Sequence, residues 1–138
     1  MNYIDANVFI YPLIYDLDQV VEAQLSKSIL SRIAIGDIKA CTSCLTWDEI
    51  VYVVSRVSGS DDSKRAGYKF LLFPNLRILG LDRKTLDCAQ ALVERYDLRP
   101  RDSIHAASAI QNKASSIVTN DDDFDVIEEL WRIGLDKL

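Results

Sequence analysis

Acidic residues stand at separate points along the chain where a parallel sheet would bring them together. Asp5 follows a short apolar segment, and Asp121 and Asp123 follow another; Glu49 and Asp102 lie early in two predicted helices. Carboxylates placed a few ångströms apart repel one another and raise each other's pKa. A hard divalent cation such as Mg²⁺ or Mn²⁺ relieves that repulsion because it prefers oxygen ligands. The pattern therefore predicts a metal site built from these acids.

Each of these acids also has an ordinary structural explanation. Asp5 can cap a helix, and Glu49 can complete a capping box with Thr46. Asp102 suits the positive end of a helix dipole. The acidic run at Asp121 is typical of a solvated loop, and it lacks the Gly and late Glu of an EF-hand. The order of the acids along the chain, rather than any single one, indicates a site.

Short apolar segments, predicted to be strands, alternate along the chain with segments of helical periodicity. These elements must position the acids. The predicted strands are residues 2–4, 38–43, 76–81, 116–119 and 130–133. The predicted helices are residues 6–11 (stopped near Pro12), a helix from Asp16 or Asp18 to Ile35 followed by Gly36, residues 46–57, 61–73, 82–96 and 102–113, and a short turn at Asp125. Such alternation predicts parallel βαβ units with helices covering the sheet. Ligands of such sheets bind at the carboxyl ends of the strands, where Asp5 and Asp121 are expected.

The composition predicts a globular chain with one domain, residues 1–138. The sequence has 138 residues and a formal net charge of −5, and no Gly-, Pro- or Ser-rich linker divides it. No apolar stretch is long enough to cross a membrane, and Asp5 interrupts any secretory start. Three cysteines, an odd number, are typical of reduced thiols. We therefore expect a cytoplasmic protein with no membrane partner.

Four segments resemble, in order and spacing, the motifs of PIN-domain nucleases. They are Tyr3-Ile4-Asp5-Ala6-Asn7, Glu49 within its helix, Arg101-Asp102-Ser103-Ile104-His105-Ala106-Ala107, and Val118-Thr119-Asn120-Asp121-Asp122-Asp123-Phe124. The likeness runs over nearly the whole chain, and the last two motifs are the most specific. The sequence departs from the family pattern at Ala6, where Thr or Ser is common. That change removes a hydroxyl group but no metal ligand.

The resemblance implies a fold, an activity and a set of partners. The fold would be α/β, a three-layer α/β/α sandwich with a mainly parallel central sheet. The activity would be that of a Mg²⁺- or Mn²⁺-dependent endoribonuclease. Small prokaryotic members resemble VapC toxins, so the expected partners are RNA, a cognate antitoxin protein and a second copy of the chain.

The resemblance also assigns roles to individual residues. Catalytic and metal-binding roles carry over to Asp5, Glu49, Asp102 and Asp121, with Asp123 as a further metal ligand, and supporting roles to Asn7 and Thr119. Because they lie next to the Asp102 motif, Arg95, Arg99 and Arg101 are the candidates for holding RNA.

Other functions stay open at this point. A catalytically silent PIN-like binding module or an RNA-processing factor would share the fold. An aspartate phosphotransferase with Asp5 as nucleophile is disfavoured because Asn7 stands where a second Asp is usual. The pair Cys41 and Cys44 could be a redox motif, but no second pair completes a zinc site. His105, the only histidine, is predicted to be a packed or hydrogen-bonded residue rather than a ligand.

One apolar stretch, residues 70–74, has two interpretations. It can belong to the core, which we favour, or it can form a surface for a dimer or an antitoxin.

Overall fold

The computed structural model describes residues 1–138 and contains one five-stranded sheet. Its strand order is β3-β2-β1-β4-β5, and every neighbouring pair is parallel. The strands are β1 (Asn2–Ile4), β2 (Ala40–Ser43), β3 (Leu76–Leu79), β4 (Ser116–Val118) and β5 (Arg132–Ile133). The chain runs outward from the central β1 in both directions, so the topological switch point lies between β1 and β4. This arrangement confirms the predicted parallel sheet.

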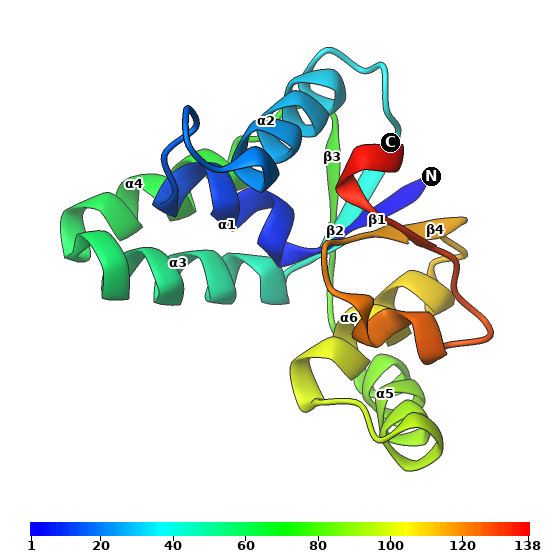
Figure 1. Ribbon diagram of the computed structural model, residues 1–138. Coiled ribbons are helices and arrows are strands. Elements are labelled where there is room, and N and C mark those ends of the chain that lie inside the picture. Colours follow the sequence, from blue (N-terminus) through cyan, green and yellow to red (C-terminus); the bar gives the residue numbers. More distant parts are fainter.

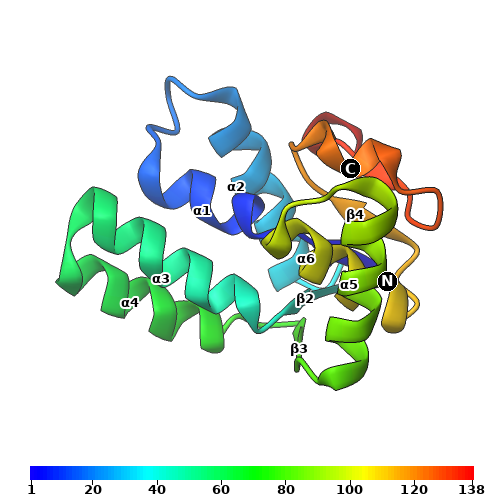
Figure 2. The same cartoon turned by 90° about the horizontal axis from the view of Figure 1, so that it is seen from below.

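Helices cover both faces of the sheet, as a three-layer α/β/α sandwich requires (Figure 1). They are α1 (Ala6–Ile14), α2 (Val21–Ala34), α3 (Leu45–Ser58), α4 (Ser60–Leu71), α5 (Arg83–Tyr96) and α6 (Pro100–Gln111), with 3₁₀ turns η1 (Asp122–Val126) and η2 (Leu135–Lys137). Helices α1 to α4 lie on one face, where α3 and α4 pair and extend past the sheet, and α5 and α6 pair on the other (Figure 2). None of these helices combines the length and apolar character needed to cross a membrane.

Two apolar cores result from the alternation of side chains along the strands. Ile4 and Val118 point into the core beneath α1 to α4, whereas Tyr3 and Ile117 point into the core beneath α5 and α6. The small residues of α6, including Ala106, let that helix pack closely on the sheet. Close packing brings the start of α6, and with it Asp102, towards the carboxyl ends of β1 and β4.

The first helix continues through the proline that was expected to stop it. Helix α1 runs to Ile14 and contains Pro12. Pro12 cannot donate a backbone hydrogen bond. The helix tolerates this near its C-terminus because Phe9 and Ile10 are buried in the core and the amide of Tyr15 still bonds the carbonyl of Tyr11 (3.0 Å). The predicted end at Tyr11 was therefore wrong by one turn.

The second helix also differs from its prediction at its start. It begins at Val21, and its N-cap, Val20, contributes no side-chain bond. The carboxylate of Asp16 instead accepts the amide of Asp18 (2.8 Å), which closes a local turn before the helix. Gly36 has φ of 84°, the left-handed conformation expected just after a helix end.

Candidate metal centre

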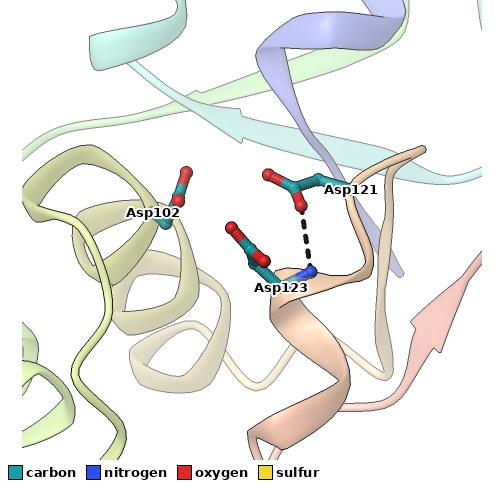
Figure 3. Close-up of side chains that lie close together, drawn as sticks. All are labelled: Asp102, Asp121 and Asp123. Atoms are coloured by element: carbon teal, nitrogen blue, oxygen red, sulfur yellow. Dashed lines mark hydrogen bonds between the residues drawn. The ribbon is translucent and has the colours of Figure 1, made fainter.

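Three aspartates from two elements converge at the carboxyl end of β4. Asp102 lies in the first turn of α6, and Asp121 and Asp123 come from the segment that follows β4. One carboxylate oxygen from each lies within 4.8 Å of the others. Figure 3 shows the three side chains pointing toward one another across the space between α6 and this segment. The spacing is that of oxygens that can share one cation.

The acidic run after β4 does not act as one solvated patch. Asp125 faces away and forms two hydrogen bonds with Arg132 (2.5 and 3.0 Å). Asp121 caps the 3₁₀ turn by accepting the amide of Asp123 (2.9 Å), as Figure 3 shows. That bond turns the chain so that residues 121 and 123 present carboxylates to the same place, whereas Asp122 is exposed.

The electrostatics of this cluster are those of crowded like charges. Partial burial, together with the nearby carboxylates of Asp121 and Asp5, raises the pKa of Asp102 to about 6. Two groups lower the pKa of Asp102 in part: the buried His105 and the largely exposed Arg99, whose Nη2 lies 3.7 Å from Asp123. They do not offset the rise, so the pKa of Asp102 stays above its ordinary value. A set of hard oxygen donors with unrelieved repulsion fits a divalent metal.

Asp5 lies at the end of β1 and has both predicted roles available. Its Oδ1 accepts the amide of Ala6 (2.7 Å) at the start of α1, and its Oδ2 accepts the hydroxyl of Thr119 (2.7 Å). Burial raises the pKa of Asp5, and these hydrogen bonds and His105 counteract part of that rise. Asp5 is 7% exposed, so its carboxylate is held rigidly at the floor of the site.

Thr119 connects Asp5 to the three-aspartate cluster. Its buried hydroxyl donates to Asp5, accepts from Nδ2 of Asn7 (2.9 Å) and accepts the amide of Asp121 (3.1 Å). One donor and two lone pairs are thereby all used. The remaining amide oxygen of Asn7 is buried and accepts no hydrogen bond from the protein. Both residues expected to support the site therefore lie in one network with two of its acids.

Glu49 does not form the capping box that Thr46 suggested. Helix α3 begins at Leu45, and the hydroxyl of Thr46 pairs instead with Thr42 (2.7 Å) beneath the helix. The carboxylate of Glu49 faces the sheet and lies 2.6 Å from Nε2 of His105. Glu49 is therefore next to Asp5 but bonded to the protein, and it is not one of the three carboxylates that converge.

His105 and Tyr3 are the neighbours of the site that sequence reasoning did not connect with it. His105 is 1% exposed and is hydrogen-bonded, as predicted, but its partner Glu49 is an acid of the site. Its Nδ1 lies 2.7 Å from the hydroxyl of Tyr3. One feature of the sequence could have indicated the role of Tyr3. Tyr3 lies two residues before Asp5, and this spacing places the side chain of Tyr3 on the face of β1 that α6 covers.

The three arginines are placed differently from one another. Arg95 is held by Glu128 and Glu129 (2.7 and 2.6 Å), away from the three aspartates. Arg99 lies beside Asp123, and Arg101 lies 5.9 Å from the ring centre of Tyr52 and 3.9 Å from Asp48. Of the three, Arg99 and Arg101 have the longer ion pairs, at 3.7 and 3.9 Å.

The two cysteines of the Cys41 and Cys44 pair differ: Cys44 is exposed at the start of α3, whereas Cys41 is not. Cys41 is buried in β2, and burial raises the pKa of its thiol to about 11, which disfavours the reactive thiolate. All three cysteines are free.

Comparison with known proteins agrees with the fold. The sequence profile of the PIN domain matches residues 3–130, so the chain belongs to the PIN domain family. No curated protein sequence matches the chain.

Solved structures with the same fold include a toxin and a toxin–antitoxin complex. VapC20 of Mycobacterium tuberculosis, a sarcin–ricin-loop-cleaving toxin, has a TM-score of 0.73 at 14% identity and covers 91% of this chain and 93% of its own. VapBC2 of Rickettsia felis, bound to a promoter DNA fragment, has a TM-score of 0.72 at 21% identity, with 97% and 98% covered. FitAcB of Neisseria gonorrhoeae has a TM-score of 0.72 at 16% identity, with 100% of both chains covered. At these identities the likeness establishes the PIN-like fold.

Proposed function

We propose that the protein is a divalent-metal-dependent endoribonuclease and the toxin of a toxin–antitoxin pair. The observation that carries this proposal is the three-aspartate cluster, whose oxygens lie within 4.8 Å of one another and whose Asp102 has a pKa raised to about 6. Membership of the PIN family and likeness to a sarcin–ricin-loop-cleaving toxin support a nuclease. A Mg²⁺ or Mn²⁺ ion is the group that best fits this donor set.

The cation would be held by Asp102, Asp121 and Asp123. Bound there, it would lower the pKa of a water molecule and neutralise charge on the phosphoryl oxygens. The chain's own residues orient this site. Asp5 is fixed by Thr119 and by the start of α1, and Thr119 also fixes the backbone of Asp121. Hydrolysis would form a bond from water oxygen to phosphorus and break the bond to the 3′ oxygen, which takes up a proton from solvent.

The RNA backbone would be held beside this cluster by Arg99 and Arg101. Both side chains are more than half exposed, and neither has an ion pair closer than 3.7 Å. Tyr52, half exposed beneath Arg101, adds an aromatic face on which a base can stack. Arg95 is omitted because two glutamates hold its guanidinium.

A protein partner is proposed from the neighbours and from exposed apolar residues. VapBC assemblies share this fold. In the stretch 70–74, Phe70 is buried and packs edge-on against Phe9 (5.4 Å), but Leu71 and Leu72 are 57% and 63% exposed. The stretch thus divides between the core and the surface, and its exposed part suits an antitoxin or a second copy of the chain. Gel filtration alone and with the antitoxin would distinguish the two.

Cleavage of a panel of RNAs tests the activity. The wild type should cleave at least one RNA with Mg²⁺ or Mn²⁺, and excess EDTA should stop it. Asp5→Asn should abolish cleavage and keep the fold, because Asn can still accept the amide of Ala6. Asp122→Asn is the matched control, since this exposed acid lies in the same run but outside the cluster. Full activity of Asp5→Asn, or cleavage in EDTA, contradicts the proposal; RNA binding without cleavage indicates a silent binding module.

A further inference from the structure

A chain of three hydrogen-bonded side chains, two buried and one partly buried, runs from β1 through α6 to α3. The hydroxyl of Tyr3 lies 2.7 Å from Nδ1 of His105, and Nε2 of His105 lies 2.6 Å from Oε2 of Glu49. Tyr3 is 0% exposed, His105 is 1% exposed, and the side chain of Glu49 is 17% exposed. The chain therefore connects the interior of the protein to the edge of the metal centre.

The carboxylate of Glu49 determines the position of one ring proton of His105. The amide of Ser43 donates to the hydroxyl of Tyr3 (3.0 Å), so the hydroxyl proton is free to point to Nδ1 of His105. Burial raises the pKa of Tyr3, which keeps that proton on the oxygen. An ionised carboxylate only accepts hydrogen bonds, so Nε2 carries the proton that meets Glu49. The imidazole ring is thereby oriented from both sides.

The hydrogen bond to Nε2 of His105 holds the carboxylate of Glu49 against α6 and not against the three aspartates. The same Nε2 lies 3.7 Å from Oδ1 of Asp5, so the ring edge stands between the carboxylates of Glu49 and Asp5. Glu49 uses Oε2 for His105, and its other oxygen is free to accept a hydrogen bond. The three aspartates converge without it.

We propose that Tyr3 and His105 are positioning residues that hold Glu49 outside the ligand sphere of the cation, where it orients the attacking water. This inference rests on the proposed nuclease function, and it assigns to Glu49 a role different from that of a metal ligand. A histidine buried only to fill space would need neither the Nε2 contact nor the Tyr3 hydroxyl. The two contacts use different ring nitrogens, so they can be removed one at a time.

The single histidine makes the proton positions measurable without activity. In ¹⁵N-histidine-labelled, metal-free protein, NMR should show one ring whose Nε2 carries a hydrogen-bonded proton. Glu49→Gln should shift that Nε2 signal and provides the reference for a ring without its carboxylate. Saturation with diamagnetic Mg²⁺ should leave the wild-type signal closer to its metal-free position than to that reference. A proton on Nδ1 alone, or a Mg²⁺-induced move to the Glu49→Gln position, overturns the proposal.

Isosteric variants test the effect on cleavage. In His105→Gln the amide nitrogen can replace the Nε2 donor, whereas in His105→Asn the amide group can occupy the place of Nδ1 but cannot reach Glu49. His105→Gln should keep kcat within about fivefold, and His105→Asn should lower kcat about 10- to 100-fold with KM and Mg²⁺ affinity nearly unchanged. Tyr3→Phe should fall between them. Equal kcat values for the Gln and Asn variants, with equal thermal stability, contradict positioning.

The two proposals fail in different ways. If the wild type neither binds Mg²⁺ nor cleaves RNA, the nuclease function is wrong, whereas the metal-free NMR signal still reports whether His105 holds Glu49. If cleavage and metal binding are present but the NMR signal moves to the reference position, only the positioning role is wrong.

Discussion

The two halves of the acidic site are stabilised in opposite ways. In one half, Asp5 is buried and Glu49 is partly buried, and both accept hydrogen bonds from the protein, namely from Thr119, the amide of Ala6 and His105. In the other half, Asp102, Asp121 and Asp123 converge within 4.8 Å, and the one arginine paired with them, Arg99, is exposed. A buried carboxylate is costly unless it accepts hydrogen bonds from the protein, whereas a partly solvated carboxylate can be stabilised by water until a cation binds. The contrast indicates that the first half is permanent structure and the second half is the binding half.

The largest expected effect comes from removing two acids of the binding half. Asp102→Asn combined with Asp121→Asn should lower the cleavage rate by roughly 10³-fold or more, because charge on the phosphoryl oxygens loses its electrostatic stabilisation. The measurement is the initial rate on the most sensitive RNA at saturating Mg²⁺. Asp122→Asn together with Asp125→Asn removes the same charge from the segment after β4, outside the cluster, and is the control. Comparable losses in both double variants would mean that net charge, and not the cluster, matters.

Loss of the hydroxyl that supports the acids should have a more moderate effect than loss of the acids themselves. Thr119→Val removes the hydroxyl that joins Asp5 to Asp121 and leaves the shape of the side chain nearly unchanged. Loss of such a supporting bond typically lowers metal affinity or activity 10- to 100-fold. Parallel Mn²⁺ titrations and rate measurements would detect it. Thr85→Val, a buried threonine that bonds Asp82 far from the site, is the control for folding effects.

The order of the acids in the sequence was enough to predict the sheet edge but not every contact. Asp5, Asp102 and Asp121 follow from the rule that parallel strands present ligands at their carboxyl ends. The direction of Glu49 did not follow, because the hydroxyl of Thr46 had an unseen partner, Thr42, on a neighbouring element. Local patterns describe contacts within a few residues, whereas this bond depends on how α3 packs on β2.

Two further differences between prediction and structure also come from contacts that local sequence patterns do not report. The bond between Tyr3 and His105 joins residues 102 positions apart, which periodicity cannot reveal. Helix α1 continued through Pro12 because buried Phe9 and Ile10 stabilise it through tertiary packing, which outweighs the local helix-breaking preference.

A pH series would sharpen the contrast between the halves. The pKa of Asp102 in the folded protein is about 6, above its ordinary value of 3.8. Below pH 6 a proton competes with the cation, so Mn²⁺ affinity should fall by up to about tenfold per pH unit. Affinity that stays constant from pH 7 to pH 5 would contradict the assignment of Asp102 as a ligand.

The same shift predicts a stability effect of opposite sign to the activity effect. Because the folded pKa is the higher one, the folded state binds more protons between pH 3.8 and 6, and stability falls as pH rises through that window. Asp102→Asn should therefore unfold at a similar or slightly higher temperature than the metal-free wild type at pH 7, by up to about 2–4 °C. Calorimetry with chelator present measures this. A clear loss of stability would mean that Asp102 has a structural role.

The smallest effects are expected at the arginines. Arg101→Gln should raise KM for RNA a few-fold and reduce the slope of log affinity against log salt by about 0.7. Arg95→Gln is the comparison, since Glu128 and Glu129 already occupy that side chain. Binding assays at several salt concentrations would separate the two, and an equal change for both arginines would remove Arg101 from the RNA site.

Calorimetric titration of Mn²⁺ into the metal-free protein at pH 7 tests the binding half most directly. The wild type should show saturable binding, Asp121→Asn should lose most of it, and Asp122→Asn should retain it. A wild type without saturable binding, or an Asp121→Asn variant that binds Mn²⁺ as tightly as the wild type, would contradict a cation site at the three aspartates.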